Sequence, residues 1–225
     1  MNRWIASSRN SADGALTPEM RPLWRISRAL IVPLFRALTG FRVENAHWVP
    51  PRGPVILAPN HNSWWDPPLV GIAAPREVYF LAKEELFTTN RLFGWLIRTY
   101  NAIPIRRETG GLEALRTALR LLDQGKAVVI FPEGTRNRTE HLLLPLKPGV
   151  FLLAKHSGAP VVPAFILHNR EPFHRWLLRK APPVVRFGPP LWARDFPNDK
   201  KGRAFNQALR QALEQLAREL GVPLP

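Results

Sequence analysis

The sequence predicts an α/β fold: a single domain with a mostly parallel or mixed central sheet flanked by helices. Short apolar runs alternate along the chain with amphipathic stretches, a pattern typical of strands that are buried between two layers of helices. The chain has 225 residues, of which 45% are hydrophobic, and a chain of this length and composition buries one sizeable core. No solenoid-type repeat or low-complexity run suggests another architecture.

The first expected element is an amphipathic helix over residues 18–38. Thr17 and Pro18 have the form of an N-cap followed by proline at the first helical position, and Pro33 predicts a kink. The apolar side chains form one broad face: Leu23, Trp24, Ile26, Leu30, Ile31, Leu34, Phe35 and Leu38. The helix is also basic, because no acidic residue follows Glu19 and four arginines do: Arg21, Arg25, Arg28 and Arg36.

The length of its apolar core indicates how this helix relates to a bilayer. The uninterrupted apolar stretch 29–35 is far shorter than the roughly 18–20 residues needed to span one. We therefore expect an N-terminal amphipathic membrane-surface helix, with a helix packed on its own domain as the alternative. On this basis residues 1–40 form a tail and a membrane-associating helix, and residues 41–225 form the main domain.

The rest of the chain alternates between strand and helix patterns. Six apolar runs are expected to be strands: 55–58, 78–81, 102–105, 127–131, 161–167 and 184–187. Two amphipathic segments, 111–124 and 205–220, are expected to be helices, and each is followed by a glycine that favours termination, Gly125 or Gly221.

Two loops at the predicted sheet edge concentrate unusual polar residues. Ligands of parallel sheets bind beyond the carboxyl ends of the strands, and the run after 55–58 reads Pro-Asn-His-Asn-Ser-Trp-Trp-Asp. Its His61 and Asp66 are five residues apart, a spacing that lets a turn leading into a helix bring the carboxylate to the imidazole. Asp66 would then hold one ring nitrogen while the other removes a proton from an alcohol. A capping Asp66 with an unrelated His61 is the simpler alternative.

The second loop, Phe-Pro-Glu-Gly-Thr-Arg at 131–136, follows another predicted strand. Gly134 allows close backbone approach, Thr135 can donate to phosphate oxygens, and Arg136 can bind them with its guanidinium fork. Glu133 is expected to pair with Arg136 or another cation, or to accept from a substrate hydroxyl. The alternative is an ordinary turn with a surface ion pair.

Charge and cysteine content limit the chemistry. The net charge of +15 favours phosphate-bearing partners, but no nucleic-acid recognition motif is present, so no nucleic acid is expected as a partner. The absence of cysteine excludes disulfides, thiolate nucleophiles and cysteine-bound metals.

Together the two loops resemble blocks of the 1-acylglycerol-3-phosphate (lysophosphatidate) acyltransferases and related glycerolipid acyltransferases. Two further segments agree, Ala-Ile-Pro-Ile-Arg-Arg at 102–107 and Ala-Pro-Val-Val-Pro at 159–163. The resemblance spans about residues 55–167. It departs at Asn101, where the family usually has glycine, and at Arg106, where it usually has an acidic residue, which leaves the preferred acceptor headgroup open.

The resemblance implies an O-acyltransferase that moves a fatty acyl group from a thioester to the free hydroxyl of a lysophospholipid, giving phosphatidate from 1-acylglycerol-3-phosphate. His61, oriented by Asp66, would act as the base, without a metal or cofactor, and acyl-coenzyme A or acyl carrier protein would be the donor. The residues implied to bind the acceptor phosphate are Lys83, Arg107, Glu133, Gly134, Thr135 and Arg136. An acyl-enzyme on Ser63 is the alternative route, although no Gly-x-Ser-x-Gly motif surrounds that serine.

The expected location is the cytoplasmic face of the cell membrane, as a peripheral or monotopic protein bound to anionic lipid. Other acceptors, namely glycerol-3-phosphate, a lyso-aminolipid or another lysophospholipid, remain open. So does a non-catalytic membrane-binding protein that uses the basic helix and the basic aromatic segment 170–186.

Overall fold

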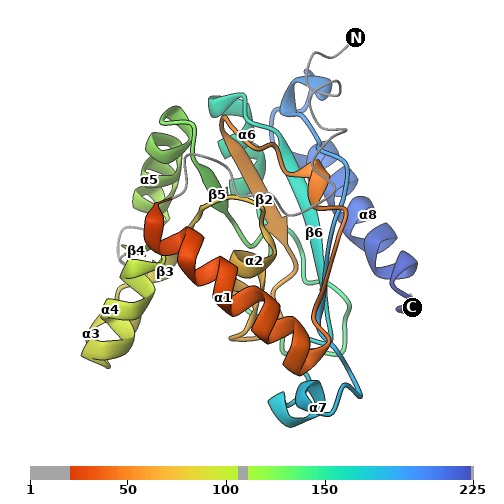
Figure 1. Ribbon diagram of the computed structural model, residues 1–225. Coiled ribbons are helices and arrows are strands. Elements are labelled where there is room, and N and C mark those ends of the chain that lie inside the picture. The colour runs from red at the N-terminus through yellow and green to blue at the C-terminus, as the bar shows by residue number, and fades with distance from the viewer. Residues whose placement is uncertain (1–20, 106–110, 224–225) are drawn as a thin grey trace.

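The computed structural model describes residues 21–105 and 111–223, and Figure 1 shows a central sheet between layers of helices. The sheet has seven strands in the order β1-β7-β6-β2-β5-β3-β4. Its strands are β1 Arg42–Glu44, β2 Val55–Pro59, β3 Val78–Lys83, β4 Ala102–Ile105, β5 Ala127–Val129, β6 Val161–Leu167 and β7 Val184–Phe187. All pairings are parallel except β6 with β7, so the predicted α/β fold with a mostly parallel sheet is confirmed.

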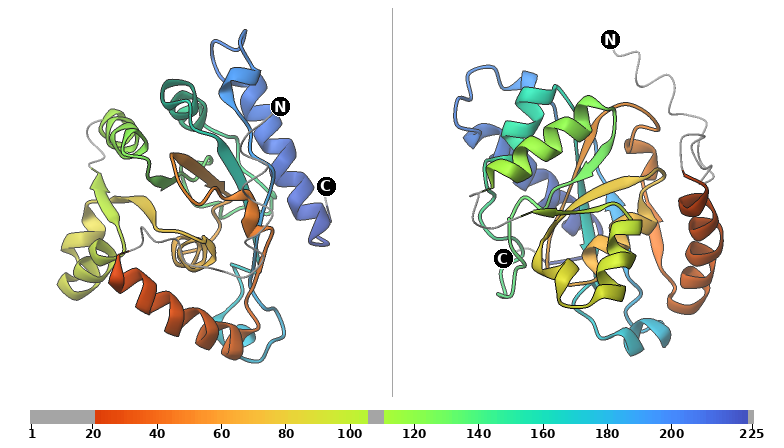
Figure 2. Two further views of the ribbon diagram at one scale, coloured as in Figure 1. Left: turned by 45° about the horizontal axis from the view of Figure 1, so that its top comes forward. Right: turned by 90° about the vertical axis from the view of Figure 1, so that its left-hand side faces the viewer.

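Helices connect the strands and cover both faces of the sheet (Figure 2). The α-helices are α1 Pro22–Thr39, α2 Asp66–Ala73, α3 Glu85–Thr88, α4 Arg91–Thr99, α5 Leu112–Asp123, α6 Gly149–Ser157, α7 Phe173–Leu177 and α8 Arg203–Glu219. Two short 3₁₀ helices, Ala46–Trp48 and Ala193–Asp195, lie in the connections.

The central strand β2 is buried on both sides because every one of its residues is apolar. Side chains alternate between the two faces of a strand, and β2 accordingly contributes to two separate cores. Leu57 packs in the core formed with Trp24 of α1, Leu69 of α2 and Trp176 of α7. Its neighbour on the opposite face, Ile56, packs in the core formed with α5, α6 and α8.

Helix α1 uses one side to pack on the domain. Trp24 is buried in the core, and the Arg28 guanidinium donates to the carbonyl groups of Gly71, Ile72 and Ala74 at the end of α2. Burial, assisted by the positive charge of Arg36, lowers the pKa of Arg28 to about 10. A cation at the carboxyl end of a helix is favourable, so α1 is anchored by charge as well as by apolar contact.

The opposite side of α1 exposes an apolar stripe. Its members recur every fourth residue along the helix: Ile26, Leu30, Leu34 and Leu38. The helix extends from Pro22 and continues through Pro33. The predicted start at Thr17 and Pro18 lies outside the described residues. Helix α1 thus packs on its own domain, which was the alternative to a membrane-surface helix, and it also has an outward apolar face; its binding to a membrane surface stays a prediction. In the ranges 21–105 and 111–223, no helix combines the length and apolarity needed to cross a membrane.

Candidate active site

The polar loops meet at one edge of the sheet, the edge that is formed by the carboxyl ends of its parallel strands. Strands β2, β5 and β6 lie side by side and run parallel, so the segments that follow them emerge at the same edge. The loop after β2 carries His61, the loop after β5 carries Glu133, and the segment after β6 carries Asn169. In Figure 1 this is the lower end of the molecule, where α7 also lies.

His61 and Asp66 are in direct contact, with Nδ1 of the imidazole 2.8 Å from Oδ2 of the carboxylate. Asp66 opens α2 and is fully buried. Oδ2 also accepts the backbone N–H groups of Asn62 and Ser63, at 2.7 and 2.8 Å. With two backbone donors already on Oδ2, the proton between the two side chains is best placed on Nδ1, and Nε2 then carries the lone pair.

The imidazole is held on its face as well. The ring of His61 stacks on Phe131, with centroids 4.0 Å apart and planes 24° apart. The His61 side chain is 17% exposed, so the ring is fixed on two sides and still reaches solvent. Among the described residues none forms a hydrogen bond with Nε2, and a positioned base with one accessible nitrogen is suited to proton abstraction.

Glu133 is buried in the same site and is 1% exposed. One carboxylate oxygen accepts the backbone N–H of His61 at 2.7 Å, and the other accepts that of Leu144 at 2.8 Å. Burial raises the pKa of Glu133, an effect that these two hydrogen bonds and the nearby His61 oppose and Asp66 reinforces. The Glu133 carboxylate thus links the loop that carries His61 to the segment around Leu144. The sequence had suggested a cation or a substrate hydroxyl as its partner.

The loop after Glu133 presents groups that can bind an anion. Gly134 has φ +66°, and a Cβ there would lie 2.7 to 2.9 Å from the side chain of Lys147, so the lysine stem lies directly over the glycine. Thr135 is exposed, and the Arg136 guanidinium stacks on the ring of Trp64 at 4.0 Å. Lys147, which sequence reasoning did not select, therefore joins Thr135 and Arg136 in this loop cluster.

The two remaining predicted phosphate ligands are placed differently. Lys83 is exposed at the end of β3, in register with Ile105 at the end of β4. Its ammonium is thus at the same sheet edge as the loops, two strands from β2. Arg107 lies outside the described residues.

Sequence reasoning missed two polar residues that follow β6. The side-chain amide of Asn169 is buried and donates to Oδ1 of Asp66 at 2.8 Å. Arg170 donates to the carbonyl groups of Asn137 and Thr139, both at 2.9 Å. Their position directly after the strand 161–167, at the edge where the other loops meet, is the signal that could have found them.

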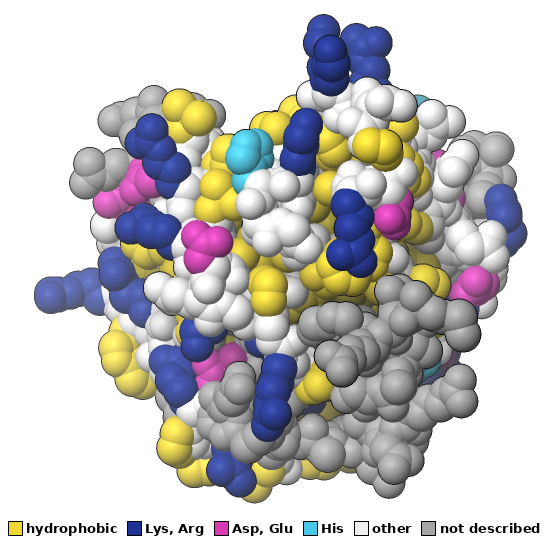
Figure 3. All heavy atoms as spheres, turned by 90° about the horizontal axis from the view of Figure 1, so that it is seen from above, with side chains coloured by type: hydrophobic (Ala, Val, Ile, Leu, Met, Phe, Trp, Pro, Cys, Tyr) yellow, Lys and Arg dark blue, Asp and Glu magenta, His cyan; other side chains and the backbone are white. Residues whose placement is uncertain are grey.

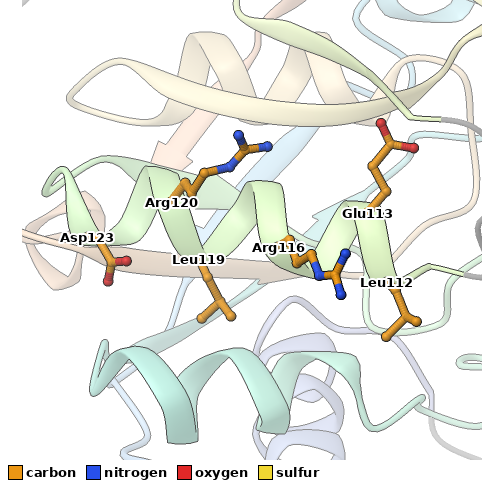
Figure 4. A pocket seen from close by; sticks show the side chains of 6 residues that line it. All are labelled: Leu112, Glu113, Arg116, Leu119, Arg120 and Asp123. Carbon is orange, nitrogen blue, oxygen red and sulfur yellow. The ribbon is translucent and has the colours of Figure 1, made fainter.

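No acidic or histidine cluster suited to a metal ion occurs in residues 21–105 or 111–223. A hollow of about 700 Å³ lies elsewhere, and its lining side chains among the described residues come from α5 (Figure 4). None of the site residues lines it.

Figure 3 shows lysine and arginine side chains spread over the end of the molecule opposite α7, so positive charge is not confined to the site.

Comparisons with known proteins identify the family of the chain. A family model described as Acyltransferase matches residues 40–167. The 1-acyl-sn-glycerol-3-phosphate acyltransferase of Bacillus subtilis is 31% identical over 185 residues, covering 80% of this chain and 90% of that protein. The enzyme of the same name from Streptococcus pneumoniae is 33% identical over 152 residues, covering 64% of this chain and 53% of its own.

Two further relatives extend the comparison. The lyso-ornithine lipid O-acyltransferase of Pseudomonas aeruginosa is 34% identical over 122 residues, covering 54% of this chain and 46% of its own. The crystal structure of the 1-acyl-sn-glycerophosphate (LPA) acyltransferase PlsC from Thermotoga maritima superimposes with a TM-score of 0.66 at 22% identity, covering 92% of this chain and 86% of that chain, which supports the fold. On the family match and the Bacillus relative, the chain belongs to the acyltransferase family, as the resemblance of its sequence blocks predicts.

Proposed function

We propose that this acyltransferase moves a fatty acyl group from an acyl thioester to the free hydroxyl of 1-acylglycerol-3-phosphate, giving phosphatidate, with His61 as the base. The observation that carries the proposal is the 2.8 Å contact between His61 Nδ1 and Asp66 Oδ2, which leaves Nε2 to face a substrate. Relatives named for this acceptor support the choice of substrate.

The reaction then needs no covalent enzyme intermediate. Nε2 of His61 takes the proton of the acceptor hydroxyl as its oxygen attacks the thioester carbonyl carbon. The tetrahedral intermediate collapses, the carbon–sulfur bond breaks, and the thiolate leaves with the proton from His61. Asp66 stabilises the imidazolium that exists between the two proton transfers. In the alternative route through Ser63, the donor alone would leave a stoichiometric acyl group on the protein.

The acceptor phosphate would bind at the loop cluster after β5. Arg136 and Thr135 provide donors there, and Lys147 adds an ammonium beside Gly134. Arg107 and Lys83 remain predicted ligands of the same phosphate. We propose no cofactor or metal, and either acyl-coenzyme A or acyl carrier protein as the donor.

We place the enzyme on a membrane surface that contains anionic lipid, on the cytoplasmic face, with residues 1–40 as the associating part and 41–225 as the catalytic domain. The outward apolar stripe of α1 supports this location. So does a second exposed apolar group, which includes a residue of the loop that carries His61: the ring of Trp65 stacks on Phe173 of α7 at 5.5 Å. Both of its substrates have lipid chains that such surfaces accommodate.

An acceptor panel tests the assignment. Thiol release from acyl-coenzyme A is measured with lysophosphatidate, glycerol-3-phosphate, lyso-ornithine lipid and monoacylglycerol, each at equal concentration in micelles. We expect lysophosphatidate to be fastest and monoacylglycerol, which lacks the phosphate, to be slowest. A preference for lyso-ornithine lipid would contradict the acceptor and leave acyl transfer intact. No release with any acceptor, with either donor, would favour the non-catalytic membrane-binding alternative.

A further inference from the structure

Helix α4 packs on its neighbour through a glycine. Asn90 caps its start, since the side-chain oxygen accepts the N–H of Phe93 at 2.9 Å. A Cβ on Gly94 would lie 2.4 Å from the carbonyl oxygen of Phe87, so at this point the backbone of α4 lies directly against α3. Gly94 therefore identifies the inner side of the helix.

The outer side of α4 is apolar, the reverse of an ordinary surface helix. The exposed fractions are 74% for Leu92, 44% for Phe93, 63% for Trp95 and 43% for Leu96. On a helical projection Leu92 and Leu96 lie opposite Gly94, with Trp95 and Phe93 on either side. Single exposed apolar residues need no explanation, but four on a helix of nine residues form a patch that indicates a partner.

Helix α4 is joined to α1, which also has an outward apolar face. The Ser27 hydroxyl lies 2.8 Å from the hydroxyl of Tyr100, the residue that ends α4. Trp24 contacts the ring of Tyr100 edge to face at 5.8 Å, and Arg21 donates to the carbonyl of Thr99 at 3.3 Å. The two exposed apolar faces therefore belong to one connected unit (Figure 2).

The charges on these two helices complement an anionic lipid surface. Neither helix contains an acidic residue, and together they carry four exposed arginines: Arg25, Arg36, Arg91 and Arg98. The acidic residues nearest to α4 in the preceding chain, Glu84 and Glu85, lie at the start of α3. Along the chain, Glu19 and Glu44 are the acidic residues nearest to α1, and Glu77 pairs with Arg21 where the two helices meet. An exposed tryptophan among leucines with arginines on the flanks is the composition of helices that lie at the boundary between headgroups and acyl chains.

We propose that the outer face of α4 is a further membrane-contacting surface, which inserts Leu92, Trp95 and Leu96 into a bilayer containing anionic phospholipid. The inference rests on the membrane-surface location proposed above and adds a contact in the interior of the chain, between β3 and β4. One surface helix alone lets a domain rotate about the helix axis. Two contacts on different helices restrict that rotation and hold the sheet edge with His61 at one orientation to the lipid.

The absence of cysteine permits a direct test by single labels. We would introduce Leu96→Cys on α4, Leu34→Cys on α1 and Leu112→Cys on α5, the last as a control because Leu112 is also an exposed leucine. Each is labelled with an environment-sensitive fluorophore and mixed with vesicles of equal parts phosphatidylcholine and phosphatidylglycerol. We expect a blue shift and quenching by brominated acyl chains at positions 96 and 34, and no response at 112.

The pattern of responses separates this inference from the proposed function. A response at position 34 without one at position 96 would overturn the contact through α4. A response at 96 that grows with protein concentration in the absence of vesicles would assign the patch to a second copy of the chain and also overturn it. Silence at both positions, with thiol release in micelles intact, would refute the membrane location and leave acyl transfer standing.

Affinity measurements provide a second readout. The double variant Leu92→Glu with Trp95→Glu should bind these vesicles on the order of tenfold more weakly, because apolar area is lost and negative charge is added. Leu112→Glu should bind like the unmodified protein. Transfer to an acceptor dispersed in detergent should stay unchanged in both, and unchanged vesicle affinity of the double variant would contradict the proposal.

Discussion

Asn169, directly after β6, donates its side-chain amide to Oδ1 of Asp66 at 2.8 Å, the oxygen that His61 does not use. The two residues are 103 positions apart, and the contact fixes the carboxylate from the side opposite the imidazole. A group that orients the partner of a base affects both the position and the basicity of that base.

Replacing Asn169 by alanine should therefore lower the rate of transfer. Without this donor the carboxylate of Asp66 loses a contact that fixes its position, so the imidazole of His61 is held less well. We expect kcat to fall on the order of tenfold, with little change in the KM values. Asn206→Ala on α8, where the amide donates to Leu146 at 3.3 Å, is the control and should keep the kcat of the unmodified protein. A kcat of Asn169→Ala equal to that of the control would show that the contact does not position the base.

Glu133→Gln tests the link between the two loops. The glutamine side chain has one oxygen that can accept a hydrogen bond, and an NH₂ group replaces the other. This NH₂ group must face the N–H of His61 or that of Leu144, and because both are donors one hydrogen bond is lost. Loss of this contact should displace His61 and lower kcat on the order of 10²-fold. Activity within twofold of the unmodified protein, roughly 0.4 kcal/mol, would show that the loop holds its shape without the carboxylate.

The raised pKa of Glu133 also predicts a pH dependence of stability. Burial holds that pKa above the ordinary glutamate value, so the folded protein binds more protons than the unfolded chain between the two values. The free energy of unfolding should then decrease as pH rises through this window. Urea unfolding at a series of pH values should show this component in the unmodified protein and lack it in Glu133→Gln; equal slopes in the two would contradict the assignment.

The fold was largely predictable because its strands are buried runs of apolar residues. Residues 55–58 and 161–167 predict β2 and β6 for this reason, and both are observed. Strand β1 was not predicted, since Arg-Val-Glu has one apolar side chain. It is the outermost strand on one side of the sheet and pairs only with β7. The expected strand 127–131 ends at Val129, because the chain turns toward the site there despite the apolar side chains that follow.

The site was predictable where chemistry is concentrated in a short run. His61 and Asp66 lie in one loop, so their contact followed from local spacing. Asn169 is a single asparagine whose partner, Asp66, is distant in sequence, and no pattern along the chain predicts such a contact. Glu133 was expected to pair with a cation, because carboxylates in proteins usually do. Its two oxygens instead accept backbone N–H groups, and this depends on the tertiary path of the chain near Leu144.

Gly134→Ala, compared with Gly158→Ala, separates backbone strain from a local clash. Both glycines have φ +66°, but a Cβ at Gly134 would meet the Lys147 side chain, and one at Gly158 would meet nothing within 4 Å. Each variant should lose about 1 kcal/mol of stability, because alanine is strained at positive φ. Only Gly134→Ala should raise the KM for lysophosphatidate, since only it displaces Lys147. Equal KM values in the two variants would exclude Lys147 from acceptor binding.

Arg136→Ala should weaken acceptor binding. A charge-assisted hydrogen bond to phosphate contributes about 1.5–3 kcal/mol, so the KM for lysophosphatidate should rise roughly 10- to 100-fold. The KM for acyl-coenzyme A should change less. Arg120→Ala, on the exposed side of α5, removes the same charge away from the site and should leave both KM values unchanged. Equal effects in the two variants would attribute binding to overall charge.

Acceptor-dependent thiol release by the unmodified protein and by His61→Ala tests whether His61 is the base for acyl transfer. The measurement uses acyl-coenzyme A and, separately, acyl carrier protein as donors, with lysophosphatidate in micelles and vesicle binding recorded in parallel. If His61 is the base, release depends on the acceptor in the unmodified protein and falls on the order of 10³-fold in the variant, while vesicle binding is retained. Release by His61→Ala at the rate of the unmodified protein would contradict the account.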